Sequence, residues 1–348
     1  MKIAIDISPI DIKSTSAHKI RGVGKYISLL RQNLEKFDKE NQYIFTSEPQ
    51  KYSSEVDVIH YPYFDPFFLT LPFRNKTKTI VTVHDVVPLV HKEHFPVGLR
   101  GAMKWKINKS RLKKASGIIT DSNASKEDIA NIVGIDDDNI HTVYLCVDEE
   151  FRKRESKQAE SELRKKYNLP GKFVLYVGDV TWNKNLPRLV IAIKKSNIPL
   201  VMVGKALTDN YDTHHPWNHD RNMVIKEIQN DPLFTRLGFV ATDDLVTLYN
   251  IAQALVMPSL DEGFGLPVLE AMKSGCPVIS SRMGSLPEVG GSAVYYIDAE
   301  NGNDIANGIS TVADNDNLRL ELAKKGLEQA TKFSTKRMIE ETAASYAK

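Results

Sequence analysis

Long apolar runs and cysteine are scarce in this sequence, and each shortage excludes a class of protein. No run approaches the roughly 20 apolar residues that a membrane-spanning helix needs. The two cysteines, Cys146 and Cys276, lie far apart without the close spacing of metal ligands, so a reduced, cytoplasmic setting is expected. Residues 1–6 predict a strand that leads into a polar segment, which is unlike a signal peptide.

An excess of charge of either sign is also absent. Lys and Arg number 46 against 44 Asp and Glu, a net charge of +2, so no overall charge draws the chain to nucleic acid. Tandem repeats and low-complexity tracts are missing too, which excludes a repeat array. What remains is 348 residues, 42% hydrophobic and 26% charged, a composition typical of a folded protein with room for two domains.

Residues 254–280 carry the most informative pattern in the chain. Residues 254–257 predict a short buried strand, and residues 277–280 predict another. Between them, Pro267 suits the first turn of a helix and Gly275 suits its left-handed end. The stretch is therefore expected to fold as strand, glycine-rich loop, helix and strand, a parallel crossover unit.

The loop of this unit has the chemistry of an anion site. In open parallel sheets, ligands bind beyond the carboxyl ends of the strands, where this loop is expected. Gly263 and Gly265 let the backbone approach a ligand, and the helix start at Leu266 offers N–H groups that favour a diphosphate. Glu262 and Glu270 flank this position and can accept hydrogen bonds from hydroxyls. The alternative is one solvated loop acid and one acid that stabilises the helix dipole.

A second glycine-rich turn occurs near the N-terminus. Gly22 and Gly24 precede a predicted helix over residues 26–37, so this turn too is a candidate cradle for a diphosphate. Ile27 stands where a dinucleotide fingerprint would have its third glycine, so that fingerprint is absent. A plain turn is the alternative.

Glu262 and Glu270 belong to a longer pattern, Pro-Ser-x-x-Glu-Gly-Phe-Gly-Leu-Pro-x-x-Glu-Ala-Met. This pattern closely resembles the signature of glycosyltransferase family 4. The resemblance implies a retaining enzyme with an α/β fold of two Rossmann-like, doubly wound domains facing a central cleft, the GT-B architecture. An N-terminal, acceptor-side domain is expected over residues 1–165 and a C-terminal, nucleotide-sugar-binding domain over residues 170–333. A helix over residues 335–348 is expected to pack back on the first domain.

The resemblance also assigns roles outside this loop. His84, at the end of a predicted strand over residues 79–84, resembles with Asp85 the family's His-Asp pair, whose histidine points at the transferred sugar. Lys184 resembles the family's lysine that neutralises the β-phosphate. The family often carries an arginine a few residues earlier, and none occurs here. Phosphate neutralisation is therefore either weaker or completed by Lys205.

Two sets of site residues follow from the resemblance. The catalytic set is Glu262, His84 and Lys184. In relatives, the loop at Phe239 and Val240 holds the base through backbone contacts. The donor-binding set is Gly22, Gly24, Asp179, Lys184, Lys205, Phe239, Val240, Gly263, Phe264, Gly265, Leu266 and Glu270.

No cofactor and no required metal are expected. Single-domain glycosyltransferases hold a metal with Asp-x-Asp at a strand end. The two comparable patterns here, residues 136–138 and 314–316, lie in polar segments that predict turns and helix caps.

A helix predicted over residues 99–115 has an unusual charge pattern. Seven cations occur in it without an acid, and apolar residues are interleaved among them. This pattern predicts a basic amphipathic helix that docks on an anionic membrane leaflet. The alternative is a solvated helix whose apolar residues pack inside. The resemblance to glycosyltransferase family 4 supports membrane docking, because many members of that family use lipid-linked acceptors.

The leading hypothesis from the sequence is therefore a retaining hexosyltransferase. It would move a mannose- or glucose-type sugar from a nucleoside diphosphate sugar to a glycan or lipid-linked acceptor in surface polysaccharide biosynthesis. GDP-mannose and UDP-hexoses are the common donors of such relatives. The alternatives are a sugar-nucleotide epimerase of the same architecture and a non-catalytic carbohydrate-binding relative. The expected location is the cytoplasm or the inner face of the cytoplasmic membrane.

Overall fold

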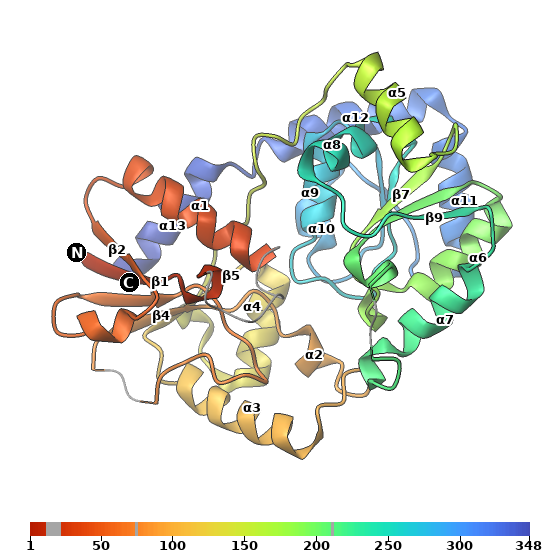
Figure 1. The fold of residues 1–348 in the computed structure, drawn as a ribbon. Coiled ribbons are helices and arrows are strands. Elements are labelled where there is room, and N and C mark those ends of the chain that lie inside the picture. The colour runs from red at the N-terminus through yellow and green to blue at the C-terminus, as the bar shows by residue number, and fades with distance from the viewer. Residues whose placement is uncertain (12–21, 74–75, 210–211) are drawn as a thin grey trace. The chain divides into compact units, whose positions relative to one another are not determined.

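The computed structural model describes residues 1–11, 22–73, 76–209 and 212–348. The chain divides into two compact units, each built around a six-stranded sheet (Figure 1). The first unit comprises Met1–Lys92, Pro96–Cys146 and Phe333–Lys348, and the second comprises Glu93–Phe95 and Val147–Lys332.

The sheet of the first unit is entirely parallel, in the order β2-β1-β3-β4-β5-β6. Every residue of β3 and β5 is buried, as in a sheet covered by helices on both faces. The strands are β1 (Lys2–Asp6), β2 (Gln42–Thr46), β3 (Val58–Tyr61), β4 (Lys78–Thr82), β5 (Gly117–Thr120) and β6 (Ile140–Thr142).

The helices of the first unit include α1 (Gly22–Phe37) and α13 (Thr335–Ala347), which come from opposite ends of the chain and lie side by side (Figure 1). The prediction that the first helix starts at residue 26 was wrong, since α1 begins at Gly22. Gly24 and Tyr26 are buried, so packing outweighs the low helix propensity of glycine. The other helices are α2 (Val87–Val90), α3 (Gly98–Leu112) and α4 (Asn123–Ile129).

The sheet of the second unit is also parallel, in the order β12-β11-β10-β7-β8-β9. The chain starts it at β7, adds β8 and β9 on one side, and then returns to add the remaining strands on the other. The strands are β7 (Val174–Val177), β8 (Leu200–Val203), β9 (Phe234–Arg236), β10 (Leu255–Met257), β11 (Val278–Ser280) and β12 (Tyr295–Tyr296). With two parallel α/β sheets, the predicted fold class is confirmed.

Helices pack on the second sheet in neighbouring pairs, such as α6 with α11 and α9 with α12 (Figure 1). Helix α5 packs against α8, where Asp244 accepts hydrogen bonds from Lys166 and Tyr167, so α5 belongs to this unit. The helices are α5 (Lys157–Tyr167), α6 (Leu186–Ser196), α7 (His219–Ile228), α8 (Thr242–Ile251), α9 (Leu266–Lys273), α10 (Leu286–Gly290), α11 (Gly302–Ala313) and α12 (Asp316–Ala330).

Several local predictions can be compared directly with these elements. Pro267 lies in the first turn of α9, and Gly275 follows the helix with a φ of 71°, which confirms both. Asp136 caps a 3-10 turn, and Asp314 and Asp316 lie at the end of α11 and the start of α12, so the prediction of turns and caps is also confirmed. Both cysteines are buried, and neither belongs to a disulfide bond in the described residues. No helix in the described part of the chain has the length and apolar character to cross a bilayer.

A buried polar network ties α13 to the first sheet. His60, on β3, is fully buried, and its ring nitrogens each lie 2.8 Å from a hydroxyl, Nδ1 from Tyr346 and Nε2 from Thr82. The Tyr26 hydroxyl lies 3.2 Å from the same Thr82 oxygen. His60 is thus a structural residue that joins strand and helix, not a residue of a ligand site.

Replacing His60 by glutamine is expected to make folding stability less sensitive to acid. Burial, together with the nearby His84, lowers the pKa of His60 to about 3. Its unfolded pKa is about 6.5, so below that pH the unfolded chain binds a proton that the folded chain does not. Through this group the wild type should lose about 2 kcal/mol of unfolding free energy between pH 8 and pH 5.

Urea denaturation of the wild type and His60→Gln at both pH values checks this expectation. The comparison of the two proteins isolates His60, because other titrating groups contribute equally to both. An equal loss of stability in both proteins between pH 8 and pH 5 would contradict it.

Candidate active site

Two loops of the second unit meet because their strands are neighbours. The loop after β7 leads through a short 3-10 helix, Trp182–Lys184, into α6, and the loop after β10 leads into α9. β10 and β7 pair in parallel, so both loops leave the carboxyl edge of the sheet side by side. The chain order reverses between these two strands, and this reversal point is where open α/β sheets bind ligands.

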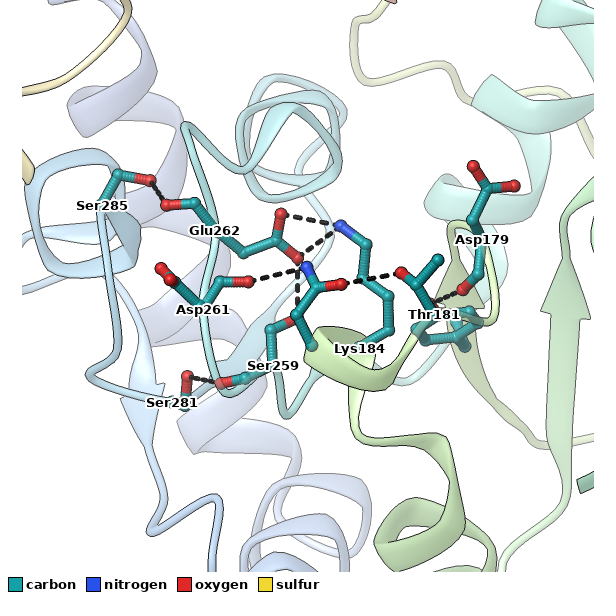
Figure 2. Close-up of polar contacts among 10 residues, drawn as sticks. Asp179, Thr181, Lys184, Ser259, Asp261, Glu262, Ser281 and Ser285 are labelled. Atoms are coloured by element: carbon teal, nitrogen blue, oxygen red, sulfur yellow. Dashed lines mark hydrogen bonds and ion pairs between the residues drawn. The ribbon is translucent and has the colours of Figure 1, made fainter. Parts of the chain in front are cut away.

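Lys184 and Glu262 form an ion pair where the two loops meet (Figure 2). The Lys184 ammonium lies 2.8 Å from both oxygens of the Glu262 carboxylate. Only 8% of the Glu262 side chain and 20% of the Lys184 side chain are exposed. The structure thus brings together two residues of the predicted catalytic set in a mostly buried charged pair.

Further hydrogen bonds fix Glu262 from its own loop and from the loop after β11. The Ser259 hydroxyl donates to Glu262 Oε1 at 2.7 Å, and the Ser285 hydroxyl donates to the Glu262 carbonyl oxygen at 2.9 Å (Figure 2). Gly284 has a φ of 54°, and a Cβ there would lie 2.6 Å from the same carbonyl oxygen. The position of Glu262 therefore depends on a close backbone approach that only glycine allows.

Two asparagines lock the Lys184 loop onto the Glu262 loop. The Asn183 amide donates to the Asp261 carbonyl at 3.0 Å, and Asn185 donates to the carbonyls of Pro258 and Ala299 at 2.9 and 2.7 Å. Asn185 is in the left-handed conformation, with a φ of 59°, which asparagine tolerates well. The sequence analysis assigned neither asparagine a role at the site.

Glu270 lies on α9 and is held by a residue that the sequence analysis also missed. The Tyr249 hydroxyl, from α8, donates to Glu270 Oε2 at 2.9 Å. Burial of Tyr249 and the charge of Glu270 raise the pKa of this phenol well above its usual value, so it stays a donor. Glu270 is partly buried on α9, one turn beyond the start of the helix.

The start of α9 follows directly from the Glu262 loop. Gly265 caps the helix with a φ of 92°, and a Cβ there would lie 2.8 Å from the Leu286 side chain. Leu266 is the first helical residue, and Gly263 lies in the loop before it. The Phe264 side chain is buried, so this residue contributes to packing more than to an exposed surface.

The other donor-binding predictions in this unit lie at the edge of the same sheet. The Asp179 carboxylate points away from the Lys184–Glu262 pair, and the Asp179 carbonyl accepts from Tyr176 (Figure 2). Lys205 is exposed after β8, and Phe239 is 67% exposed after β9, next to the buried Val240. Asp179, Lys205, Phe239 and Val240 thus lie in the segments that follow β7, β8 and β9.

An aromatic cluster surrounds Trp182, two residues before Lys184. Trp182 stacks on His94 with ring centroids 3.7 Å apart, and Phe95 contacts both Trp182 and Trp217 edge-on. Residues 93–95 belong to the second unit, with Trp182 and Trp217. The loop that carries Lys184 is therefore supported by aromatic packing two residues before the lysine.

The remaining predicted residues lie in the first unit. Gly22 and Gly24 form the first turn of α1, where Gly22 is exposed and Gly24 is buried. His84 Nδ1 lies 2.8 Å from Asp121 Oδ2, a carboxylate at the end of β5 that the sequence analysis did not single out. Burial disfavours a charged His84, but the Asp121 charge outweighs this and raises the pKa of His84.

The geometry of the second unit defines what it can do chemically. A helix N-terminus and an ammonium group, both at the edge of the sheet, suit the negative charge of a diphosphate. Two fixed carboxylates suit hydroxyl donors. Among the described residues, no group of three or more His, Cys, Asp or Glu side chains is placed to hold a metal ion.

Family models match most of the chain. The model described as "Glycosyl transferases group 1" matches residues 158–329, and the model described as "Glycosyltransferase Family 4" matches residues 20–151.

Curated relatives are similar over a large part of the chain. An O-antigen chain mannosyltransferase B of Escherichia coli is 30% identical over 298 residues, which cover 83% of this chain and 75% of the relative. A serotype-specific mannosyltransferase WbdA of the same species is 29% identical over 78% of this chain. The chain spans about a third of the length of that second relative, 33%.

Solved structures share the fold of the whole chain. A sucrose-phosphate synthase from Thermosynechococcus elongatus has a TM-score of 0.73 at 18% identity, covering 100% of this chain and 98% of that one. Anabaena Alr3699/HepE, solved in complex with UDP and glucose, also has a TM-score of 0.73 at 18% identity, covering 100% and 99%. Both domains therefore have the Rossmann-like fold of GT-B glycosyltransferases, as the sequence predicted.

Proposed function

The chain belongs to glycosyltransferase family 4, and from this premise we propose that it transfers a hexose from a nucleoside diphosphate sugar to a glycan or lipid-linked acceptor. The role proposed for this transfer is surface polysaccharide biosynthesis. The observation that carries the proposal is the buried Lys184–Glu262 pair at the reversal point of the second sheet.

The diphosphate, the transferred sugar and the ribose of a sugar nucleotide each have a proposed partner in the second unit. Lys184 and the N-terminus of α9 at Leu266 are proposed to receive the diphosphate. Glu262 is proposed to accept hydrogen bonds from the transferred sugar, and Glu270 from the ribose hydroxyls. In the first unit, His84 is proposed to hydrogen-bond the sugar, with Asp121 fixing its ring orientation.

The proposed reaction retains the configuration at the anomeric carbon. The bond from that carbon to the diphosphate oxygen breaks, and the acceptor hydroxyl attacks from the same face. The leaving phosphate oxygen takes the proton of the acceptor hydroxyl. The protein must then stabilise the negative charge that develops on the leaving diphosphate. A fixed ammonium group and helix N–H groups can provide this stabilisation.

The donor proposed first is GDP-mannose, because two relatives carry mannosyltransferase in their names. UDP-glucose is the competing donor. A thermal-shift comparison of GDP, UDP and ADP distinguishes them, since a ligand that binds the folded state raises the melting temperature by mass action. Release of GDP from GDP-mannose with an added glycan acceptor then tests transfer, and an unchanged rate in EDTA is expected because no metal is proposed.

No nucleotide-dependent shift and no acceptor-dependent release with any common sugar nucleotide would contradict the proposed function. Donor turnover without any acceptor, giving an epimerised sugar nucleotide, would replace transfer by epimerisation.

Tyr249→Phe is expected to weaken donor binding without stopping transfer. The change removes the hydroxyl that orients the Glu270 carboxylate, and such a bond to a charged group is worth about 1.5 kcal/mol, so KM for the donor should rise about tenfold. The turnover number should change little, because Glu270 is assigned to the ribose. Steady-state kinetics with varied donor measures both quantities.

Tyr296→Phe is the matched control. Its hydroxyl donates to the Gly291 carbonyl at 2.8 Å, a bond of the same kind in the same unit but away from Glu270. A donor KM that rises equally in both variants would indicate a general loss of stability and not a role in orienting Glu270.

A peripheral contact with the inner face of the cytoplasmic membrane is also proposed, through the basic helix predicted over residues 99–115, which the structure contains as α3. A lipid-linked acceptor would require such a contact.

A further inference from the structure

Helix α3 presents a basic outer surface with apolar residues in its midst. All seven charged residues from Gly98 to Lys114 are Lys or Arg. Leu99, Met103 and Lys106 follow the spacing of one helix face, and Leu99 and Met103 are 89% and 62% exposed. The opposite face is buried through Asn108 and Leu112. The apolar residues on the outer face are therefore not used to pack α3 onto the sheet.

The loop over residues 65–73 lies along α3 and adds three more exposed apolar side chains. Phe68, Leu69 and Phe73 are 63%, 46% and 76% exposed. Of the twelve large hydrophobic side chains that are exposed in the described residues, five lie on this loop and on α3. We refer to these five, Phe68, Leu69, Phe73, Leu99 and Met103, as the apolar patch.

The loop is held in place by side chains of α3. The buried Asn108 amide nitrogen lies 3.0, 3.2 and 2.7 Å from the carbonyl oxygens of Asp65, Pro66 and Phe68. Arg111 donates to the Leu71 carbonyl. Because the backbone is already fixed, the exposed phenylalanines can meet a partner without the entropic cost of ordering a loop.

Cations of α3 also lie directly over the loop's aromatic rings. The Lys104 ammonium is 5.0 Å from the centre of the Phe68 ring, and the Arg111 guanidinium is 3.8 Å from the centre of the Phe73 ring. The surface therefore alternates aromatic and cationic groups, and α3 carries no acid that would attract a basic partner.

We propose that the apolar patch and the surrounding cations of residues 100–114 dock on an anionic lipid bilayer, with Phe68 and Phe73 inserted among the acyl chains. The charge complementarity selects the partner, since anionic headgroups meet the exposed Arg100, Lys106 and Lys114 while the interior of the leaflet takes the aromatic rings. This inference rests on the proposed function, because a lipid-linked acceptor is what the docking would serve.

Vesicle co-sedimentation tests the docking. The probes are phosphatidylcholine vesicles with and without phosphatidylglycerol, and binding by the full chain is expected only with phosphatidylglycerol. The Phe68→Ser/Phe73→Ser variant and the Lys106→Glu/Lys114→Glu variant should each bind about tenfold or more weakly. High salt should weaken the binding of the wild type only in part, since the inserted rings are not screened.

Leu320→Ser/Lys324→Glu is the matched control, because both residues are exposed on α12 of the second unit. Its binding to vesicles should equal that of the wild type. Equal sedimentation of the wild type with both kinds of vesicle would overturn the proposal, and so would wild-type binding by the Phe68→Ser/Phe73→Ser variant with an unchanged melting temperature.

The thermal shift caused by GDP or UDP separates this proposal from the proposed function. Docking variants that lose vesicle binding and keep the nucleotide shift support the docking surface. A protein that binds anionic vesicles through the apolar patch but shows no nucleotide shift would contradict the glycosyltransferase assignment and leave the docking supported.

Discussion

Glu262→Gln is expected to lower sugar transfer by about a thousandfold while the second unit stays folded. The glutamine side chain keeps the volume and can still accept from Ser259, but it loses the charge that pairs with Lys184 and accepts from the sugar. Losing one preorganised electrostatic group in an active site typically costs about 10²- to 10³-fold in rate. Product formation from donor and acceptor at saturation measures the effect.

Glu321→Gln is the control for this prediction. Glu321 pairs with Lys325 at 2.6 Å, but the pair lies on the surface of α12, with exposed fractions of 46% and 56% for the lysine and the glutamate. Transfer by that variant should match the wild type. Full activity of Glu262→Gln with the true donor would remove the central residue of the proposal. Glu262→Ala should lose transfer as well, with an added loss of stability because Ser259 and Lys184 lose their partner.

Lys184→Met is expected to lower both transfer and stability. The methionine fills similar space but leaves the Glu262 carboxylate, which is 8% exposed, without its counter-charge. Breaking a buried pair in this way costs about 3–5 kcal/mol, and about 2–3 is expected here because one fifth of the Lys184 side chain reaches solvent. Transfer should fall about a hundredfold or more, because the leaving diphosphate loses its cation.

The double variant Lys184→Met/Glu262→Gln separates the two effects. Removing both charges removes the unpaired carboxylate, so urea denaturation should show that much of the stability lost in Lys184→Met returns. Transfer should remain as low as in either single variant. Lys325→Met, in the exposed pair on α12, should change neither quantity. If transfer recovered along with stability in the double variant, the pair would be structural and not catalytic.

Most of the fold was predictable because strands and helices leave local patterns of apolar and turn residues in the sequence. Central strands such as β8, whose four residues are all buried, are continuous apolar runs bounded by turn residues. Two of the four outer strands, β2 and β12, were not predicted. β2 is mostly partly exposed and β12 has only two residues, so neither carries a strong apolar pattern. The start of α1 was placed too late because glycine was taken as a helix boundary.

The candidate site was predictable as a set of residues, and less so as an arrangement. Glu262 and Glu270 stood out because they belong to one motif around a helix start, and Lys184 because it resembles the family's phosphate-binding lysine. Their partners did not. Tyr249 and Asp121 lie on elements with ordinary patterns, and only packing shows that they hold Glu270 and His84. Asp179, predicted with the same loop, turns its carboxylate away from the ion pair (Figure 2).

The sequence alone determined the parallel α/β units, the loop with its two glutamates and the family, because strand runs, glycine turns and motif spacing are properties of neighbouring residues. Only the tertiary structure decided that Lys184 and Glu262, 78 residues apart, share one buried ion pair. The physical reason is strand order. β10 returns to pair with β7, and this pairing depends on how the whole sheet packs, which no short stretch of sequence encodes.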